Sequence, residues 1–247
     1  MGRFETSRTS SSSLSLLATG VATPVIRVSA CSRPQGESGG DFYDLLPYDE
    51  EHLGVFIGDV SGHGPHVGEI GALTRDLMRQ QARRYGVTDP SAMLASLNLS
   101  LFDHLPKHVF VTAVFGVLHR PSGAFRFVRA GHTPPLLVTE DRVEQTQAAG
   151  IALGLDRGTL FTGSLRAERL VFREGDRLLL FTDGLTEAED ASETQYGTER
   201  LGEALMNYRS IDGEESFLTA LLRDWRQHLD GQPPQDDVTV IGLHHTR

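Results

Sequence analysis

Aspartate beside glycine, at the end of an apolar run, recurs along this sequence. Asp59 follows the apolar residues 53–57, and Asp183 follows residues 177–182, and both runs are apolar enough for buried strands. A carboxylate at such a position is costly unless a positive charge meets it. The glycine-rich loop after Asp59 opens a helix, whose free N–H groups favour an anion. Carboxylates beside an anion site indicate cations between them, which is the chemistry of metal-assisted phosphoryl transfer.

Two further aspartates occupy comparable places. Asp41 follows a pair of glycines before a short strand, and Asp236, with Asp237 beside it, precedes the last apolar run. Four gathered like charges repel strongly unless neutralised, and two divalent cations would bring about +4 against −4. All these ligands are hard oxygens, which favours Mg or Mn over Zn. Each aspartate alone is also explained as a turn or cap residue, so the inference depends on the joint pattern.

The elements that must position these residues are strands interrupted by two pairs of helices. We expect strands at residues 25–33, 41–46, 53–58, 109–119, 124–129, 136–139, 165–172, 177–182 and 238–244. We expect helices at residues 65–85, from Pro90 to about residue 105, and at 198–208 and 214–229, with a polar loop or short helix at 188–196. This order is not a βαβ alternation, so it favours antiparallel sheets with helices packed outside.

Composition and charge narrow the class of protein. The chain has 247 residues, 33 acidic against 23 basic side chains and a net charge of −10, which argues against a nucleic-acid or anionic-membrane partner. Residues 1–23 are rich in Ser and Thr and are expected to be a disordered tail, with a transit peptide as the weaker reading, and residues 24–247 a single domain. No apolar run approaches ~18 residues, so no transmembrane helix is expected. A single cysteine, Cys31, suits a reducing, cytoplasmic compartment and is interpreted as a small buried hydrophobe.

Seven short motifs carry a resemblance to a known family. They are GGDFYD at 39–44, GDVSGHG at 58–64, AGH at 130–132, LGL at 153–155, FTDGLTE at 181–187, YG at 196–197 and DDVT at 236–239. In this order the set resembles the metal-dependent protein phosphatases (type 2C-like), in the bacterial SpoIIE-like branch of serine phosphatases. The resemblance spans residues 24 to 244. Any one motif is weak, whereas the ordered set is specific.

The resemblance implies an α+β fold, an antiparallel β-sandwich flanked by helices on both sides, with two Mn²⁺ or Mg²⁺ ions between the sheets. It implies that Asp59 bridges both ions and that the carbonyl of Val60 binds one. The remaining ligands that it implies are Asp41, Asp183 and Asp236, with Asp237 the less certain member of the last pair. A metal-bridging hydroxide would then attack phosphoserine or phosphothreonine without a covalent enzyme intermediate, because metals lower the pKa of water and clamp the phosphoryl oxygens.

One position departs from the eukaryotic members, where a histidine two residues after the bridging aspartate is a candidate general acid. Here Ser61 stands at that offset and His63 lies two residues further on. We interpret His63 either as the general acid or as a loop histidine bonded to backbone. Arg33 is either a phosphate clamp or a strand-end surface arginine. His132, at the end of a hairpin, is interpreted as structural.

The sequence therefore supports a serine/threonine protein phosphatase. By resemblance, its substrate is a phosphorylated regulatory protein, an anti-sigma-factor antagonist, and an activator protein could shift the helices beginning at Pro65 and Asp89. A first alternative is a catalytically silent regulatory or binding module of the same fold in a partner-switching pathway. A second is a hydrolase of small phosphoesters. Four arginines on the first helix, Arg75, Arg79, Arg83 and Arg84, form either a solvated face or a docking patch for an acidic partner.

Overall fold

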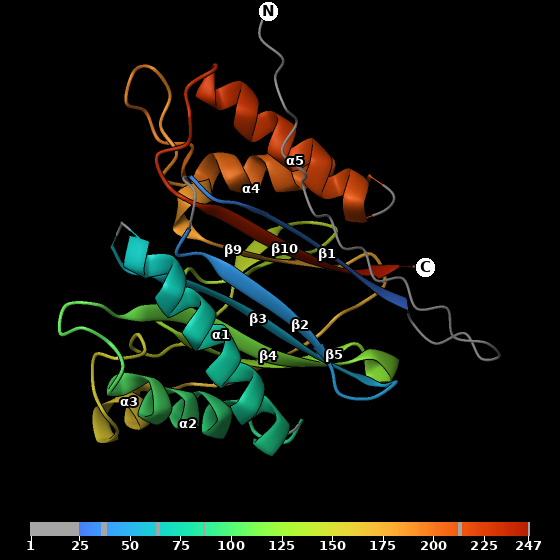
Figure 1. Cartoon of the computed structure of the whole chain (residues 1–247). Helices are drawn as coiled ribbons and strands as arrows, with labels where there is room; N and C mark the ends of the chain where they lie inside the picture. Colours follow the sequence, from blue (N-terminus) through green and yellow to red (C-terminus); the bar gives the residue numbers. More distant parts are fainter. Residues whose placement is uncertain (1–24, 36–38, 63–64, 86, 212–213, 247) are drawn as a thin grey trace, which may run out of the picture.

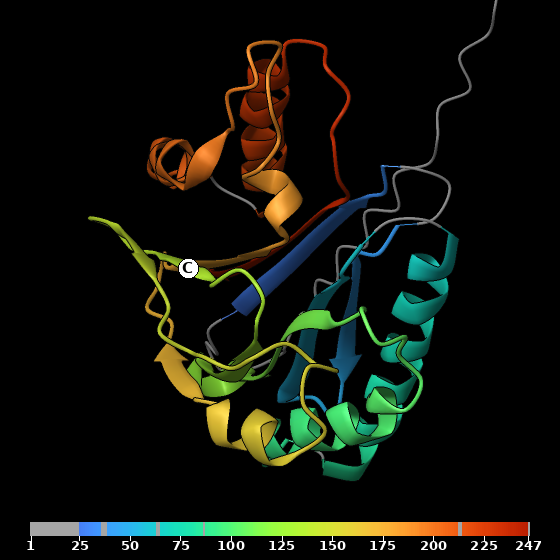
Figure 2. The same cartoon turned by 90° about the vertical axis from the view of Figure 1, so that its left-hand side faces the viewer.

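Two antiparallel sheets face each other and carry helices on their outer surfaces. The computed structural model describes residues 25–35, 39–62, 65–85, 87–211 and 214–246, so the expected tail at residues 1–23 and His63 lie outside the described residues. Figure 1 shows α1 and α2 outside one sheet and α4 and α5 outside the other, and Figure 2 shows the same layers from the side. The expected α+β sandwich with helices on both sides is confirmed.

Each sheet has five strands. The first sheet, in spatial order, holds β1 (Val25–Arg33), β10 (Val238–Thr246), β9 (Arg177–Phe181), β6 (Leu136–Val138) and β7 (Val143–Gln145). The second holds β2 (Phe42–Pro47), β3 (His52–Val60), β4 (Val111–His119), β5 (Ala124–Ala130) and β8 (Glu168–Val171). The helices are α1 (Pro65–Tyr85), α2 (Pro90–Phe102), α3 (Thr159–Ser164), α4 (Gly197–Tyr208) and α5 (Glu214–Leu229). Short 3₁₀ turns lie at η1 (Arg120–Ser122) and η2 (Asp183–Leu185).

Alternation of side chains along the strands divides the interior into three apolar layers. On β3, Val55 and Ile57 face the other sheet, whereas Phe56 faces α1 and α2. On β9, Leu178 and Leu180 face between the sheets, and their neighbours pack under α4 and α5 around Trp225. Every second side chain of these strands therefore points into the layer between the sheets.

The termini of the helices follow the expected local chemistry. Asp89 caps α2, and its side chain accepts hydrogen bonds from the N–H groups of Ser91 and Ala92 at 3.0 and 3.1 Å. The helix ends at Phe102 and not near residue 105, because the segment after it turns and the Asp103 N–H donates to the carbonyl of Leu101. Among the described helices, none is both long and apolar enough to cross a membrane.

Two elements were not expected from the sequence. The predicted strand at 165–172 is shorter, β8 covering only Glu168–Val171, and the six-residue helix α3 precedes it. Strand β7 is also new, and all three of its residues are at least partly exposed. Segments this short or this polar show too little apolar periodicity to be recognised.

Candidate functional site

The carboxylates converge because alternation along the strands carries them into the layer between the sheets. Asp59 continues the series that places Val55 and Ile57 in that layer, at the point where β3 ends. Asp41 directly precedes β2, in phase with Tyr43, which packs against the same layer. The two aspartates thus lie where the sandwich opens, with apolar core behind them.

Asp183 and Asp236 come from neighbouring strands of the opposite sheet. Asp183 is the first residue of η2, directly after β9, and Asp236 lies just before β10, which pairs with β9. A glycine is required between them: a Cβ on Gly184 would lie 2.1 Å from the carbonyl oxygen of Asp237. The close approach of these two segments therefore depends on the Asp-Gly sequence.

The electrostatics show that the aspartates act on one another. Burial, and then the charges of Asp183, Asp236 and Asp237, raise the pKa of Asp59 to about 7. Burial raises the pKa of Asp41 to about 8, with contributions from Asp59 and Asp237, against hydrogen bonds from the side chains of Thr182 and Thr239 that lower it. The pKa of Asp236 is also raised, first by burial. The site thus holds more negative charge than its surroundings stabilise.

One further carboxylate belongs to this group and was missed in the sequence. Glu187 lies four residues after Asp183, and its pKa is raised by burial and by the charges of Asp183 and Asp236. Its position at the end of the FTDGLTE motif was the available signal. Because Glu187 is close enough to feel the charges of Asp183 and Asp236, the acidic group also includes the segment that follows η2.

The donor set fits a hard divalent cation in its chemistry. It consists of mutually repelling carboxylates, the central ones partly buried, a charge distribution that cations between them would relieve. Within the part of the chain that the structure describes, no group of three or more His, Cys, Asp or Glu side chains stands in an arrangement that could hold a metal ion as it is. Three of the aspartates, Asp41, Asp236 and Asp237, accept hydrogen bonds from protein donors.

Asp237 fastens the segment that carries Asp41. Its Oδ1 accepts a hydrogen bond from the N–H of Gln35 at 2.6 Å, and its Oδ2 accepts one from the N–H of Asp41 at 3.2 Å. The contact is tight, since a Cβ on Gly39 would lie 2.2 Å from Asp237 Oδ2. Both oxygens of this carboxylate therefore already serve backbone donors.

The carbonyl of Val60 lies beside the double glycine. The N–H of Val60 donates to the carbonyl of Gly40 at 3.3 Å, and a Cβ on Gly40 would lie 3.0 Å from Val60 O and 3.3 Å from Asp59 Oδ1. The absence of a side chain at residue 40 allows the two loops to meet. Val60 O and Asp59 Oδ1 thus both lie beside Gly40.

Ser61 is used to hold the loop after Asp59. Its Oγ accepts a hydrogen bond from the N–H of Phe110 at 2.9 Å, and its own N–H donates to the carbonyl of Phe110 at 2.9 Å. The next candidate, His63, lies outside the described residues. Arg33, at the end of β1, is only partly exposed. Its Nε has no hydrogen-bond partner among the described residues.

One arginine of α1, Arg79, forms an ion pair with a residue of β2. Arg79 Nε donates to Asp44 Oδ2 at 2.5 Å, and the same arginine lies 3.9 Å from Asp76. Arg83 and Arg84 are exposed at the end of the helix. The first of these interactions ties the helix that follows the Asp59 loop to the strand that follows Asp41.

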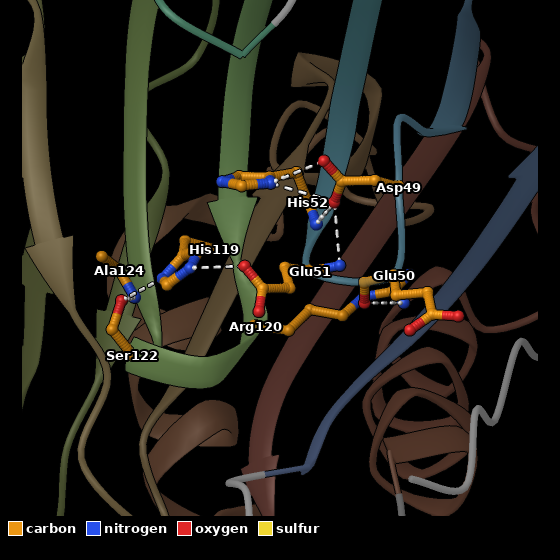
Figure 3. A network of polar contacts seen from close by, with 8 residues as sticks. All are labelled: Asp49, Glu50, Glu51, His52, His119, Arg120, Ser122 and Ala124. Atoms are coloured by element: carbon orange, nitrogen blue, oxygen red, sulfur yellow. Dashed lines mark hydrogen bonds and ion pairs between the residues drawn. The ribbon is translucent and has the colours of Figure 1, made fainter.

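A separate polar cluster lies at the opposite end of β3 from Asp59 (Figure 3). Asp49 accepts from His52 Nδ1 at 3.0 Å and from the N–H groups of Glu51 and His52 at 2.8 and 2.7 Å. The rings of His52 and His119 lie 4.9 Å apart, and His119 Nε2 lies 3.6 Å from Glu51. These contacts join the turn before β3 to the end of β4. None of them involves Asp41, Asp59, Asp183 or Asp236.

Comparisons with known proteins identify a family and related sequences. A model of the SpoIIE family, described as stage II sporulation protein E, matches residues 49–246. Protein IcfG from Synechocystis sp. is 23% identical over 244 residues, covering 88% of this chain and 38% of the relative. Phosphoserine phosphatase RsbU from Bacillus subtilis is 24% identical over 224 residues, covering 87% of this chain and 62% of the relative. The chain thus spans less than two thirds of the length of either relative.

Solved structures show the same fold. The RsbU and RsbW domains of Rv1364c from Mycobacterium tuberculosis match with a TM-score of 0.74 at 26% identity, covering 91% of this chain and 61% of that one. The PP2C phosphatase domain of SpoIIE from Bacillus subtilis, with a fragment of its regulatory domain, gives a TM-score of 0.75 at 17% identity, covering 90% and 64%. RsbX in complex with magnesium gives 0.64 at 14% identity, covering 88% and 94%. The last two similarities concern the fold alone.

Proposed function

This chain belongs to the SpoIIE family of PP2C-type phosphatases, and we propose that it hydrolyses phosphoserine or phosphothreonine on a regulatory protein in a metal-dependent reaction. The observation that carries the proposal is the group of mutually repelling aspartates at the open end of the sandwich, of which Asp41 and Asp59 are partly buried. Metal dependence is characteristic of the family, and such a group is what a pair of cations would stabilise.

The proposed ligands of two Mn²⁺ or Mg²⁺ ions are Asp41, Asp59, Asp183 and Asp236, with the carbonyl of Val60. When bound, such ions lower the pKa of water and neutralise charge on the phosphoryl group. The chain itself supplies the alignment. Asp237 holds the Asp41 segment through two backbone N–H groups, and Ser61 holds the loop after Asp59. Because both oxygens of Asp237 accept from backbone donors, we assign the ligand role to Asp236.

His63 is proposed as the general acid on the basis of its place in the same glycine-rich loop, two residues after Ser61. Ser61 is a poor candidate for that role because a serine hydroxyl is too weak an acid to give up its proton near neutral pH, and its oxygen serves the Phe110 N–H. Replacement of His63 by Gln is expected to slow hydrolysis of phosphoserine more than hydrolysis of an aryl phosphate, whose leaving group needs no proton. Equal effects on the two substrates would contradict the assignment.

We further propose a substrate and a setting by analogy with the relatives. RsbU is a phosphoserine phosphatase, and in Rv1364c an RsbU domain shares a chain with an RsbW domain. The proposed substrate is therefore a phosphorylated anti-sigma-factor antagonist in the cytoplasm. An activator protein would act on α1 and α2, since α1 begins where the loop after Asp59 ends.

The test is release of phosphate from a phosphoserine protein with Mn²⁺, with Mg²⁺ and with a chelator, for the wild type and for Asp183→Asn. Metal-dependent turnover that the substitution abolishes is the expected result. Asp141→Asn, at an exposed turn, is the matched control and should leave turnover unchanged. Turnover of aryl phosphates alone would indicate a small-phosphoester hydrolase. No turnover of either substrate, with candidate activators added, would favour the silent module.

A further inference from the structure

A row of hydroxyl groups runs through the layer between the sheets and ends on Asp41. Ser32 Oγ and Thr239 Oγ1 lie 2.9 Å apart, across the pairing of β1 with β10. The N–H of Thr239 donates to Thr182 Oγ1 at 2.9 Å, and Thr182 Oγ1 donates to Asp41 Oδ2 at 2.7 Å. The row thus joins three neighbouring strands of one sheet to a carboxylate beside the other.

The direction of the last bond follows from the others. A hydroxyl has one proton to donate, and Thr182 Oγ1 already accepts the N–H of Thr239. The proton can point to Asp41 Oδ2 at 2.7 Å or to the carbonyl of Thr239 at 3.5 Å, and the second distance is at the limit for a hydrogen bond. The carboxylate therefore receives the proton, and Thr182 is a fixed donor.

The threonine side of this contact is closed to water. Thr182 and Thr239 are both completely buried. Loss of the Thr182 hydroxyl would leave the buried Thr239 N–H without its acceptor, which is expensive, and would remove a donor from Oδ2 of the partly buried Asp41. The backbone N–H of Asp41 is held separately by Asp237, at 3.2 Å.

We propose that Thr182 is a positioning residue for metal binding: its hydroxyl holds Oδ2 of Asp41 against the sheet and leaves Oδ1 as the oxygen that meets a cation. The inference rests on the proposed function, because it assigns Asp41 a role as metal ligand. It adds that Asp41 binds through a single oxygen and that Thr182, the residue after β9, decides which one. Asp237 sets the backbone of Asp41, and Thr182 sets its carboxylate.

The test is calorimetric titration of the full chain with Mn²⁺, which needs no turnover. Thr182→Val keeps the shape of the side chain and removes the hydroxyl, and it should weaken binding about ten-fold, which corresponds to about 1.4 kcal/mol. Thr182→Ser keeps the hydroxyl and should bind within about two-fold of the wild type. Thr146→Val is the matched control, because Thr146 is also buried and its hydroxyl has no hydrogen-bond partner among the described residues. It should bind as the wild type does.

A double-mutant cycle with Asp41→Asn separates positioning from general destabilisation. If Thr182 acts through Asp41, Thr182→Val should add little to the loss that Asp41→Asn already causes. Full additivity, or equal losses in Thr182→Val, Thr182→Ser and Thr146→Val, would overturn the inference. If Thr182→Val does not fold, the comparison of Thr182→Ser with the wild type still decides it, since loss of affinity with the hydroxyl retained contradicts the proposal.

The same data distinguish this inference from the proposed function. Wild-type protein that binds Mn²⁺ and shows the Thr182 effect, yet releases no phosphate from a phosphoprotein, would support the positioning role and contradict the phosphatase. Wild-type protein that turns over phosphoprotein, with Mn²⁺ affinity unchanged by Thr182→Val, would do the reverse. Absence of Mn²⁺ and Mg²⁺ binding by the wild type would contradict both.

Discussion

Thr112 Oγ1 lies 2.8 Å from Nδ1 of His132, and Thr112 is the cross-strand partner of Asp59. The histidine is only 3% exposed, and burial, followed by the charge of Arg129, lowers its pKa to about 3. His132 is therefore a neutral imidazole at physiological pH, as suits a structural residue. It supports β4 at the residue that pairs with the central aspartate of the site.

Acid should destabilise the fold through His132. The unfolded chain binds a proton at His132 near pH 6.5, whereas the folded chain does so only near pH 3, so the free energy of unfolding falls as pH drops below about 6.5. Between pH 6.5 and 5 this loss is about 2 kcal/mol. Urea unfolding at the two pH values should show a smaller difference for His132→Gln. An equal difference in both proteins would contradict the role given to this residue.

Replacement of Asp59 should raise the stability of the metal-free protein and lower the turnover of the metal-loaded protein. With a chelator present, Asp59→Asn removes one of several repelling buried carboxylates and should raise the free energy of unfolding by roughly 2 kcal/mol. With Mn²⁺ present, the same variant should lose at least about 100-fold in turnover. Thermal unfolding with and without chelator, alongside phosphate release, measures both. A variant less stable than the wild type under chelator would argue that the repulsion is already relieved within the protein.

Loss of the Ser61 hydroxyl should loosen the loop after Asp59. Ser61→Ala leaves the Phe110 N–H without its acceptor, so we expect a loss of about 1 kcal/mol in stability. Turnover should fall by a few fold with little change in KM, because the loop aligns groups and does not grip the protein substrate. Ser210→Ala, at an exposed position, is the control. Unchanged turnover in Ser61→Ala would show that the loop is held by other contacts.

Two glycines should respond to alanine in opposite directions. Gly184→Ala places a methyl group 2.1 Å from the carbonyl oxygen of Asp237, a backbone atom that cannot move freely, and should cost about 3 kcal/mol and most of the turnover. Gly202→Ala in α4 meets no atom within 4 Å and should stabilise the protein by about 0.5 to 1 kcal/mol. Chemical denaturation of both variants tests the pair. A tolerated Gly184→Ala would mean that the two aspartate segments can separate without loss.

The long elements could be predicted because their patterns are long. Helices α1 and α5 and strand β1 have the predicted bounds, since many consecutive residues support one period in each. The short elements α3 and β7 could not be predicted, because six or three residues carry too little pattern. The resemblance supplied the pairing of the sheets that local periodicity cannot give.

The sequence was enough to propose Asp41, Asp59, Asp183 and Asp236 as candidate ligands. It did not show which residues form hydrogen bonds with the aspartates. The bond from Thr182 to Asp41 joins residues 141 positions apart, and the bond from Gln35 to Asp237 spans 202. Such contacts depend on how two sheets stack, and nothing in the local sequence encodes that distance. The same reason hid the role of Glu187, whose pKa is shifted by neighbours that meet it only in the folded sandwich.

Strand β10 lies between β1 and β9, so the strand that joins β1 to the rest of its sheet is the last described strand of the sequence. During synthesis, β1 and β9 leave the ribosome without the partner that joins them, whereas all five strands of the other sheet have already appeared. Asp236 is synthesised two residues before β10 begins. A nascent chain can therefore complete the sheet of α1 and α2 early, whereas the proposed cation site forms only when β10 is inserted, so that termination before β10 should yield a protein without that site.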